Sequence, residues 1–222
     1  MTKTAKLLIL IFFLVLFSTY SPNNILENKS IIFPIKKIEI QNLRIIESKA
    51  IQIELDYLKD SSLLFIQNEN LQAILEKNEF VKSFNLKKIY PNTIKIFIDE
   101  KIPVAIYFDK KKKFFLFEDG TLATYKNISN LNDLPLVYGQ KIKFKSFFLN
   151  LKKTQFPLKN VKAFQYFGIG RWDIVLKSNK TIKLPVKNYL KSLENFLIIK
   201  NNKNFIKYEI FDYRISDQLI LN

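Results

Sequence analysis

The sequence predicts an α+β protein with an N-terminal apolar helix followed by two folded regions. An unbroken apolar run occupies Leu7–Phe17, and a strand–helix–helix–strand–strand pattern occupies residues 33–103. Strand-length apolar segments then recur over residues 104–222. The chain has 222 residues, 48% of them hydrophobic, which is enough for one large core or two small ones.

The apolar run has the layout of a signal sequence. Lys3 and Lys6 precede it, and such a positive flank predicts a cytoplasmic N-terminus. A helix over residues 5–20 would be about 24 Å long, shorter than an apolar bilayer core of about 30 Å. This shortness favours a cleaved signal peptide, whereas the lack of a small-residue cleavage site favours a retained anchor. In both cases the residues after about Ser21 are expected outside the cytoplasm.

In the retained form, residues 1–6 are a short cytoplasmic tail and residues 7–21 cross the membrane. The polar, turn-rich residues 22–32 then form a tether. The predicted span includes Leu7, Phe12 and Phe17.

The first folded region reads as β-α-α-β-β. Apolar residues alternate over 35–40 and 94–98, which indicates strands. Helical spacing marks 48–58, where Ser48 can serve as N-cap, and 68–75. A Tyr-Pro-Asn turn then joins the last strand to an apolar stretch before it. The inward isoleucines of these strands are expected to form a core.

The second region, residues 104–222, is predicted to be a strand-rich domain with one or two helices. Apolar segments of strand length, separated by turn residues, occur at 104–108, 113–117, 161–167, 172–176 and 181–184. Helical spacing follows at 189–199, and the chain closes with apolar segments at 208–211 and 219–221.

Composition excludes several kinds of chemistry. The chain has no Cys and no His, so thiol nucleophiles, imidazole bases and Cys- or His-ligated zinc are excluded, and no metal or cofactor is expected. The formal net charge of +16 has two interpretations: an anionic partner, or lysine as the default surface residue of an A/T-rich genome. The only arginines are Arg44, Arg171 and Arg214, and this scarcity weakens the nucleic-acid interpretation.

Two groups of residues invite a site interpretation that we do not adopt. Asp99, Glu100 and Asp119 lie at a strand end and in a turn, with no base beside them, so no catalytic residue is predicted. Gly170 and Trp172 flank an arginine, which suggests a ligand site, but we favour a core tryptophan beside a turn glycine.

Seven segments together resemble the FtsQ/DivIB family of bacterial cell-division proteins. They are FPIKKIEIQN at 33–42, SLLFIQNENL at 62–71, FVKSFNLKKIYPNTIKIFIDEKIPVAIY at 80–107, EDGTL at 118–122, LPLVYG at 134–139, GRWDIVLKSNKTIKLP at 170–185 and FDYR at 211–214. The resemblance lies in their order and spacing, since no single segment is diagnostic.

The resemblance implies a protein of the cell inner membrane. It implies a retained transmembrane helix, a POTRA domain over residues 33–103 and a β domain over 104–222, with the bulk of the chain periplasmic at the division septum. It further implies a non-enzymatic scaffold that binds FtsB- and FtsL-like bitopic coiled-coil proteins and links early and late division proteins. No small-molecule substrate is implied.

The predicted partner surface is the C-terminal edge of the β domain. Residues 215–221 are expected to form the last strand, which either accepts a partner strand or simply closes the sheet. Asp217 and Gln218 are expected to suppress self-pairing. The Arg214 guanidinium either binds a partner carboxylate or pairs within the chain with Asp212 or Glu209. The predicted partner-binding residues are Tyr213, Arg214, Ile215, Leu219, Ile220 and Leu221.

A second function remains open from the sequence. POTRA-type units also occur in chaperone modules that bind exported or outer-membrane polypeptides. A single such unit directly behind a membrane anchor favours the division scaffold.

Overall fold

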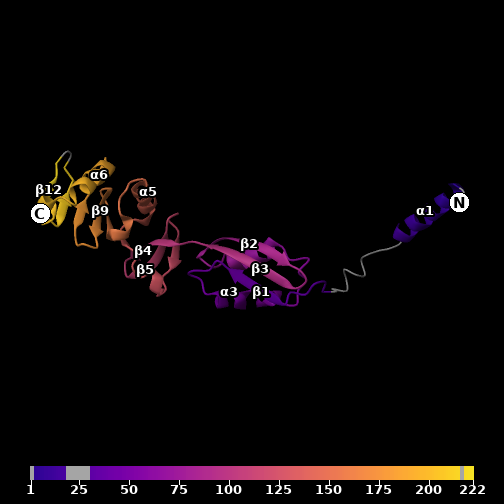
Figure 1. Ribbon diagram of the computed structural model, residues 1–222. Coiled ribbons are helices and arrows are strands. Elements are labelled where there is room, and N and C mark those ends of the chain that lie inside the picture. Colours follow the sequence, from indigo (N-terminus) through magenta and orange to yellow (C-terminus); the bar gives the residue numbers. More distant parts are fainter. Residues whose placement is uncertain (1–2, 19–30, 216–217) are drawn as a thin grey trace. The chain divides into compact units, whose positions relative to one another are not determined.

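The structure is a computed structural model that describes residues 3–18, 31–215 and 218–222 (Figure 1). Its contacts divide the chain into two compact units. The N-terminal unit comprises Met1–Gln41, Ser48–Ile74 and Asn85–Phe97, and the C-terminal unit comprises Asn42–Glu47, Leu75–Phe84 and Ile98–Asn222. The predicted boundary between residues 103 and 104 stays a prediction, because residues 42–47, 75–84 and 98–103 group with the C-terminal unit.

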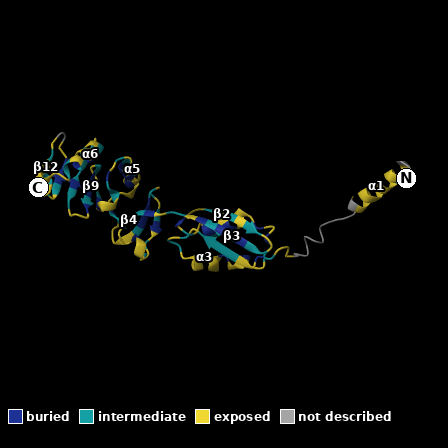
Figure 2. Ribbon diagram, viewed as in Figure 1, coloured by how far each residue is buried: buried dark blue, intermediate teal, exposed yellow. Residues whose placement is uncertain are grey.

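The N-terminal apolar run forms helix α1, Lys3–Ser18. Its apolar side chains are exposed, for example Leu8 at 67% and Leu14 at 64% (Figure 2). Among the described residues, no helix is both long enough and apolar enough to span a bilayer. The predicted span over 7–21 is therefore not confirmed, and its last three residues and tether residues 22–30 lie outside the described part of the chain.

The β-α-α-β-β order predicted for residues 33–103 is confirmed. The elements are β1 (Lys37–Gln41), α3 (Ser48–Glu54), the 3₁₀ turn η1 (Asp56–Leu58), α4 (Asn68–Leu75), β2 (Val81–Ile89) and β3 (Thr93–Glu100). The N-terminal unit contains all of them except the last residue of α4, the start of β2 (81–84) and the end of β3 (98–100). The sheet has the order β1-β3-β2, with β1 parallel to β3. The predicted helix 48–58 is two elements, because the Leu58 amide bonds the Leu55 carbonyl three residues back and tightens the chain into a 3₁₀ turn.

The core of this unit is apolar and fully enclosed at the middle strand. Ile94 and Ile96 of β3 are 0% exposed, which confirms their predicted core position. Ile38 and Ile40 lie beside them in register on β1, yet both are only partly buried. The apolar face of the sheet therefore continues to the outer edge of β1 without being covered there.

The C-terminal unit is built on one nine-stranded sheet with the order β12-β11-β10-β9-β8-β7-β4-β5-β6. Its strands are β4 (Pro103–Asp109), β5 (Lys112–Phe117), β6 (Leu122–Thr124), β7 (Leu136–Tyr138), β8 (Val161–Phe167), β9 (Arg171–Leu176), β10 (Thr181–Lys183), β11 (Ile210–Asp212) and β12 (Ile220–Leu221). The pairs β4–β7, β7–β8 and β10–β11 are parallel, and the other adjacent pairs are antiparallel.

Helices α5 (Lys141–Lys152) and α6 (Tyr189–Ile199) pack on one face of this sheet, and short 3₁₀ turns occupy Ser129–Leu131, Leu158–Asn160 and Lys203–Phe205. Phe144 of α5 contacts Phe164 of β8, and Phe196 of α6 contacts Phe211 of β11. The covered face carries a row of side chains in register that are 0% exposed: Val137, Phe164, Ile174, Ile182 and Phe211.

The opposite face of the same strands is polar. The residues in register there are Gln165, Asp173, Lys183 and Asp212, on β8 to β11. Side chains alternate between the two faces along a strand, so these polar residues face away from the apolar row beneath the helices. It leads across the sheet to β12, where the predicted partner surface lies.

Candidate partner-binding edge

Strand β12 is an outer strand of the nine-stranded sheet, paired on one side only. Ile210 donates its amide to the Asn222 carbonyl at 2.9 Å, and Asn222 donates back to the Ile210 carbonyl at 3.2 Å. In an antiparallel ladder the residues between such pairs direct their N–H and C=O groups outward. Leu221 and Leu219 occupy these outward positions, and within the described chain their main-chain groups have no hydrogen-bond partner.

Apolar side chains flank this open edge on both faces. Leu221 lies across from Phe211, and both Leu219 and Leu221 pack against the core. On the polar face Ile220 lies across from Asp212 and is 42% exposed. Ile215 is also exposed. A strand added here would therefore gain main-chain hydrogen bonds and cover apolar surface at the same time.

The Arg214 guanidinium makes an ion pair within the chain. Its Nε lies 2.8 and 2.9 Å from the two carboxylate oxygens of Asp212, and its Nη2 lies 2.5 Å from Oδ2. The Arg214 amide also donates to Asp212 Oδ1 at 3.1 Å. Of the two alternatives left open by the sequence, the intrachain pair with Asp212 is the one the structure contains.

This pair shifts the ionisation of both groups. The hydrogen bond from Arg214 holds the pKa of Asp212 below its ordinary value, against the opposing effect of burial. The same hydrogen bond raises the pKa of Arg214. Because the Asp212 side chain is almost fully buried, the pair fixes the bend of the chain immediately after β11.

Tyr213 requires a correction to the predicted partner surface. Its ring is 6% exposed and belongs to the core beneath α6, and its hydroxyl donates to Asn195 Oδ1 at 2.9 Å. Burial raises the pKa of Tyr213 to about 12. The side chain faces the core because it continues the alternation from Phe211, so Tyr213 positions the edge and does not line it.

The predicted last strand is also shorter than expected. Residues 215–221 were expected in one strand, whereas β12 contains only Ile220–Leu221. Gln218 is exposed, and Asp217 lies outside the described residues, so its predicted role against self-pairing stays a prediction.

A charged row on the polar face reaches this edge, and the sequence interpretation missed it. Arg171, Asp173, Lys183, Asp212 and Arg214 occupy neighbouring positions on β9, β10 and the end of β11. The spacings R-x-D and D-x-R place opposite charges on one face of a strand, which is the signal that identifies the row.

The two acids of the row differ in how well they are paired. Asp173 is 4% exposed, and its Oδ1 lies 3.2 Å from Arg171 Nε, yet neither atom makes a hydrogen bond. Burial raises the pKa of Asp173, although Arg171, Lys183 and Arg214 oppose the shift. Asp212 therefore forms a hydrogen-bonded ion pair with Arg214, whereas the ion pair of Asp173 with Arg171 lacks a hydrogen bond.

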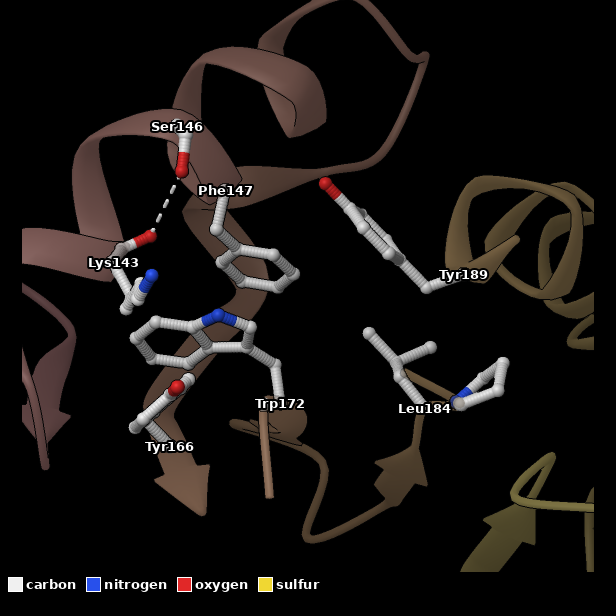
Figure 3. Close-up of a pocket in the computed structure, with 9 residues that line it drawn as sticks. Lys143, Ser146, Phe147, Tyr166, Trp172, Leu184 and Tyr189 are labelled. Atoms are coloured by element: carbon white, nitrogen blue, oxygen red, sulfur yellow. Dashed lines mark hydrogen bonds between the residues drawn. The ribbon is translucent and has the colours of Figure 1, made fainter. Parts of the chain in front are cut away.

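The sole tryptophan lines a pocket of about 200 Å³ on the helix-covered side of the sheet (Figure 3). Figure 3 shows the Phe147 ring over the Trp172 indole, a stacked pair with centroids 4.6 Å apart. Trp172 is 6% exposed, and Gly170 has a φ of +93° in the preceding turn. The interpretation of Trp172 as a core residue beside a turn glycine is confirmed.

The three acids considered for catalysis have structural contacts. Asp99 pairs with Lys82 at 3.1 Å, and Asp119 accepts hydrogen bonds from the Thr121 amide and hydroxyl. The Glu100 carboxylate accepts three backbone amides, those of residues 44, 45 and 46, at 2.8–3.1 Å. Within the described ranges no cluster of acids could hold a metal ion.

Comparison with known proteins identifies the class of the chain. Residues 33–101 match the POTRA domain of FtsQ type, so the β-α-α-β-β fold described above is that of a POTRA-domain protein. The chain is 27% identical over 201 residues to the cell division protein FtsQ of Rickettsia conorii, which covers 88% of this chain and 75% of that protein. FtsQ of Bartonella bacilliformis is 24% identical over 165 residues, covering 72% and 54% of the two chains.

These matches confirm the resemblance to the FtsQ/DivIB family of cell-division proteins. A structural comparison also aligns the chain with the major extracytoplasmic domain of the cell division protein DivIB from Geobacillus stearothermophilus. That alignment has 17% identity and a TM-score of 0.34, and it covers 48% of this chain and 96% of the other.

Proposed function

We propose that this protein is a cell-division scaffold that acts by binding and carries out no chemistry. It holds FtsB- and FtsL-like bitopic proteins at the septum by accepting a strand from one of them at the outer edge of β12. The relationship to FtsQ proteins supports a division role. The observation that carries the binding mode is the outward direction of the Leu219 and Leu221 main-chain groups, with the exposed apolar side chain of Ile220 between them.

The same proposal includes retention of α1 as the membrane anchor, with the N-terminus in the cytoplasm and the rest of the chain in the periplasm. The exposed apolar side chains of α1 support it, since each Å² of apolar surface left in water costs about 25 cal/mol. Bitopic partners share one membrane with an anchored scaffold, which keeps them close. N-terminal sequencing of the membrane-extracted protein checks this part, and a start near Ser21 would overturn it.

A substitution at the outward position of β12 tests the binding mode. Leu221→Pro removes an amide that points away from β11, so the β11–β12 bonds are unaffected, and proline is tolerated on edge strands. We expect the full chain in detergent micelles to bind the periplasmic part of the FtsB-like protein of the same organism about tenfold more weakly after this change.

Leu221→Ala is the matched control, because it shortens the same side chain and keeps the amide. It should weaken binding much less than Leu221→Pro, and truncation after Arg214 should abolish binding. Equal affinities of the proline and alanine variants would contradict the added strand. Absence of binding by the intact chain would contradict the proposal that the FtsB-like protein is the partner. Equal affinity for an unfolded exported polypeptide would instead favour the chaperone alternative.

A further inference from the structure

A second candidate docking surface lies in the N-terminal unit, between β1 and helix α3. It is an open groove of about 660 Å³. Its lining includes two isoleucines, Ile38 and Ile53, together with four lysines. The groove belongs to the POTRA unit alone, so the inference drawn from it does not rest on the proposed role of β12.

Unpaired main-chain groups form one wall of the groove. Strand β1 is an outer strand that pairs only with β3, and Lys37 donates its amide to the Asn92 carbonyl at 3.2 Å. In a parallel ladder alternate residues bond the neighbour, so Ile38 and Ile40 direct their N–H and C=O groups outward. Within the described part of the chain these outward groups have no hydrogen-bond partner.

The floor of the groove is apolar. Ile53 of α3 is 68% exposed, and Ile38 of β1 is only partly buried although its neighbour in register, Ile94, is 0% exposed. The core therefore stops at β1 with one apolar row uncovered. A strand placed beside β1 would extend that row by one residue and cover Ile38 and Ile53 together.

The rim of the groove is cationic. Lys37 and Lys59 already pair with Glu39 and Asp56, at 2.6 and 2.5 Å. Lys36 and Lys49 are exposed, and neither has an acidic partner among the residues described. Two unpaired ammonium groups beside an open strand edge favour a negatively charged occupant.

We propose that the β1–α3 groove binds an extended acidic segment of a second protein, which adds to β1 as a strand. An apolar residue of the segment covers Ile38 and Ile53, and its carboxylates pair with Lys36 and Lys49. The main chain of the segment bonds the outward groups of Ile38 and Ile40. The protein then has two strand-accepting edges, one on each unit.

Short synthetic peptides test this with the full-length protein in detergent micelles. The probe is a labelled peptide of sequence EEVEVEE, and the comparison peptides are KKVKVKK and EEVPVEE, whose proline removes a central main-chain donor. Fluorescence anisotropy measures affinity, and amide hydrogen exchange locates the site. We expect the first peptide to bind and to slow exchange at Ile38 and Ile40, and the other two to bind at least about tenfold more weakly.

A pair of charge reversals separates the groove from general attraction to a basic protein. Lys36→Glu with Lys49→Glu should weaken EEVEVEE binding by about tenfold and improve KKVKVKK binding. Lys87→Glu with Lys162→Glu makes the same change in net charge at exposed lysines outside the groove, and it should leave affinity within about twofold.

Four outcomes overturn the inference, the first three of which concern affinity. These three are equal effects of the two double variants, equal binding of EEVPVEE, and absence of measurable EEVEVEE binding. Slowed exchange at Leu221 with Ile38 unchanged would also overturn it, because the peptide would then occupy the β12 edge. The β12 proposal stands or falls separately, on the Leu221 variants.

Discussion

The two outer strands of the nine-stranded sheet, β6 and β12, differ in whether their outward main-chain groups have hydrogen-bond partners. At β6, the Thr124 amide donates to Glu79 Oε2 at 2.8 Å, so a side chain from an earlier part of the chain satisfies the exposed donor. At β12, Leu219 and Leu221 direct their main-chain groups outward and find no such partner in the described chain. An exposed edge is an aggregation hazard unless it is blocked or used. The outward Thr124 donor of β6 is therefore satisfied within the chain, whereas the outward main-chain groups of β12 are open to a partner.

The two edges also place their charges differently. The Glu79 carboxylate points at the main chain of β6 and occupies its hydrogen-bonding position. The Asp212 carboxylate is turned instead toward Arg214, beside β12 but not across it. The ion pair therefore stabilises the chain next to the open edge without closing the edge itself. This arrangement predicts which substitutions change the stability of the C-terminal unit and which change the exposure of an outer strand to a partner.

The largest effect on stability is expected for Arg214→Ala. It leaves the Asp212 carboxylate, 5% exposed, without its guanidinium, so the free energy of unfolding of the C-terminal unit should fall by more than in any of the variants below. Urea unfolding measures this change. Arg44→Ala is the control, because among the described residues Arg44 has a backbone bond to Glu100 but no side-chain hydrogen bond or ion pair. Equal losses of unfolding free energy in the two variants would mean that the Asp212–Arg214 ion pair does not stabilise the chain beside β12.

The next effect is expected for Glu79→Ala, which should turn the blocked edge into an open one. The Thr124 amide loses a charge-assisted but exposed hydrogen bond, so stability should fall by about 1 kcal/mol. Amide exchange at Thr124 should accelerate, and self-association should increase. Glu47→Ala removes an exposed carboxylate in the same unit and should change neither. Unchanged exchange at Thr124 would show that Glu79 does not block β6.

Acidification should remove the stabilisation that the Asp212–Arg214 ion pair gives to the chain beside β12. The pKa of Asp212 is lowered in the folded state, so its contribution is complete above the unfolded pKa of about 3.9 and is lost as the pH falls through the folded value. The stability difference between the wild type and Asp212→Asn should therefore shrink on acidification below about pH 4. A difference that stays constant down to low pH would assign the effect of Asp212 to its shape and not to its charge.

The smallest effect is expected for Asp173→Asn, and it should have the opposite sign. Burial raises the pKa of Asp173, so at neutral pH its ionised form costs stability, a cost that disappears as the pH falls through the raised pKa. The amide should be neutral or stabilising by up to about 1 kcal/mol near pH 7. If Asp173→Asn lowered the free energy of unfolding as much as Arg214→Ala does, the attraction of Arg171 and Lys183 would fully offset the cost of burying the Asp173 charge.

Local periodicity was sufficient for most elements of the fold. Strand 161–167 and helix 189–199 have the predicted bounds, and helix α4 begins at Asn68, which was expected as its N-cap. Helix α5 was missed although Phe144, Phe147, Phe148 and Leu151 repeat at helical spacing, because no N-cap side chain or glycine marks its ends. β7 was missed because three residues between turns carry no detectable alternation.

The candidate sites depended on contacts that a sequence pattern does not contain. The sequence indicated that Arg214 would pair, but Asp212 was one of several candidate partners, and the chain direction after β11 decided among them. The inward turn of Tyr213 follows from the register of β11, set by β10. The β1–α3 groove joins segments with no shared motif, so only the folded chain shows that Ile38 and Ile53 line one surface.

The stacking of Trp172 on Phe147 provides an intrinsic optical reporter. The chain has one tryptophan, and it is buried in the C-terminal unit against α5. Its emission therefore follows the melting of that unit alone, while far-ultraviolet circular dichroism follows both units. Two transitions that coincide would show that the units melt as one cooperative system. Two that separate would give the POTRA unit a stability of its own, readable without any added label.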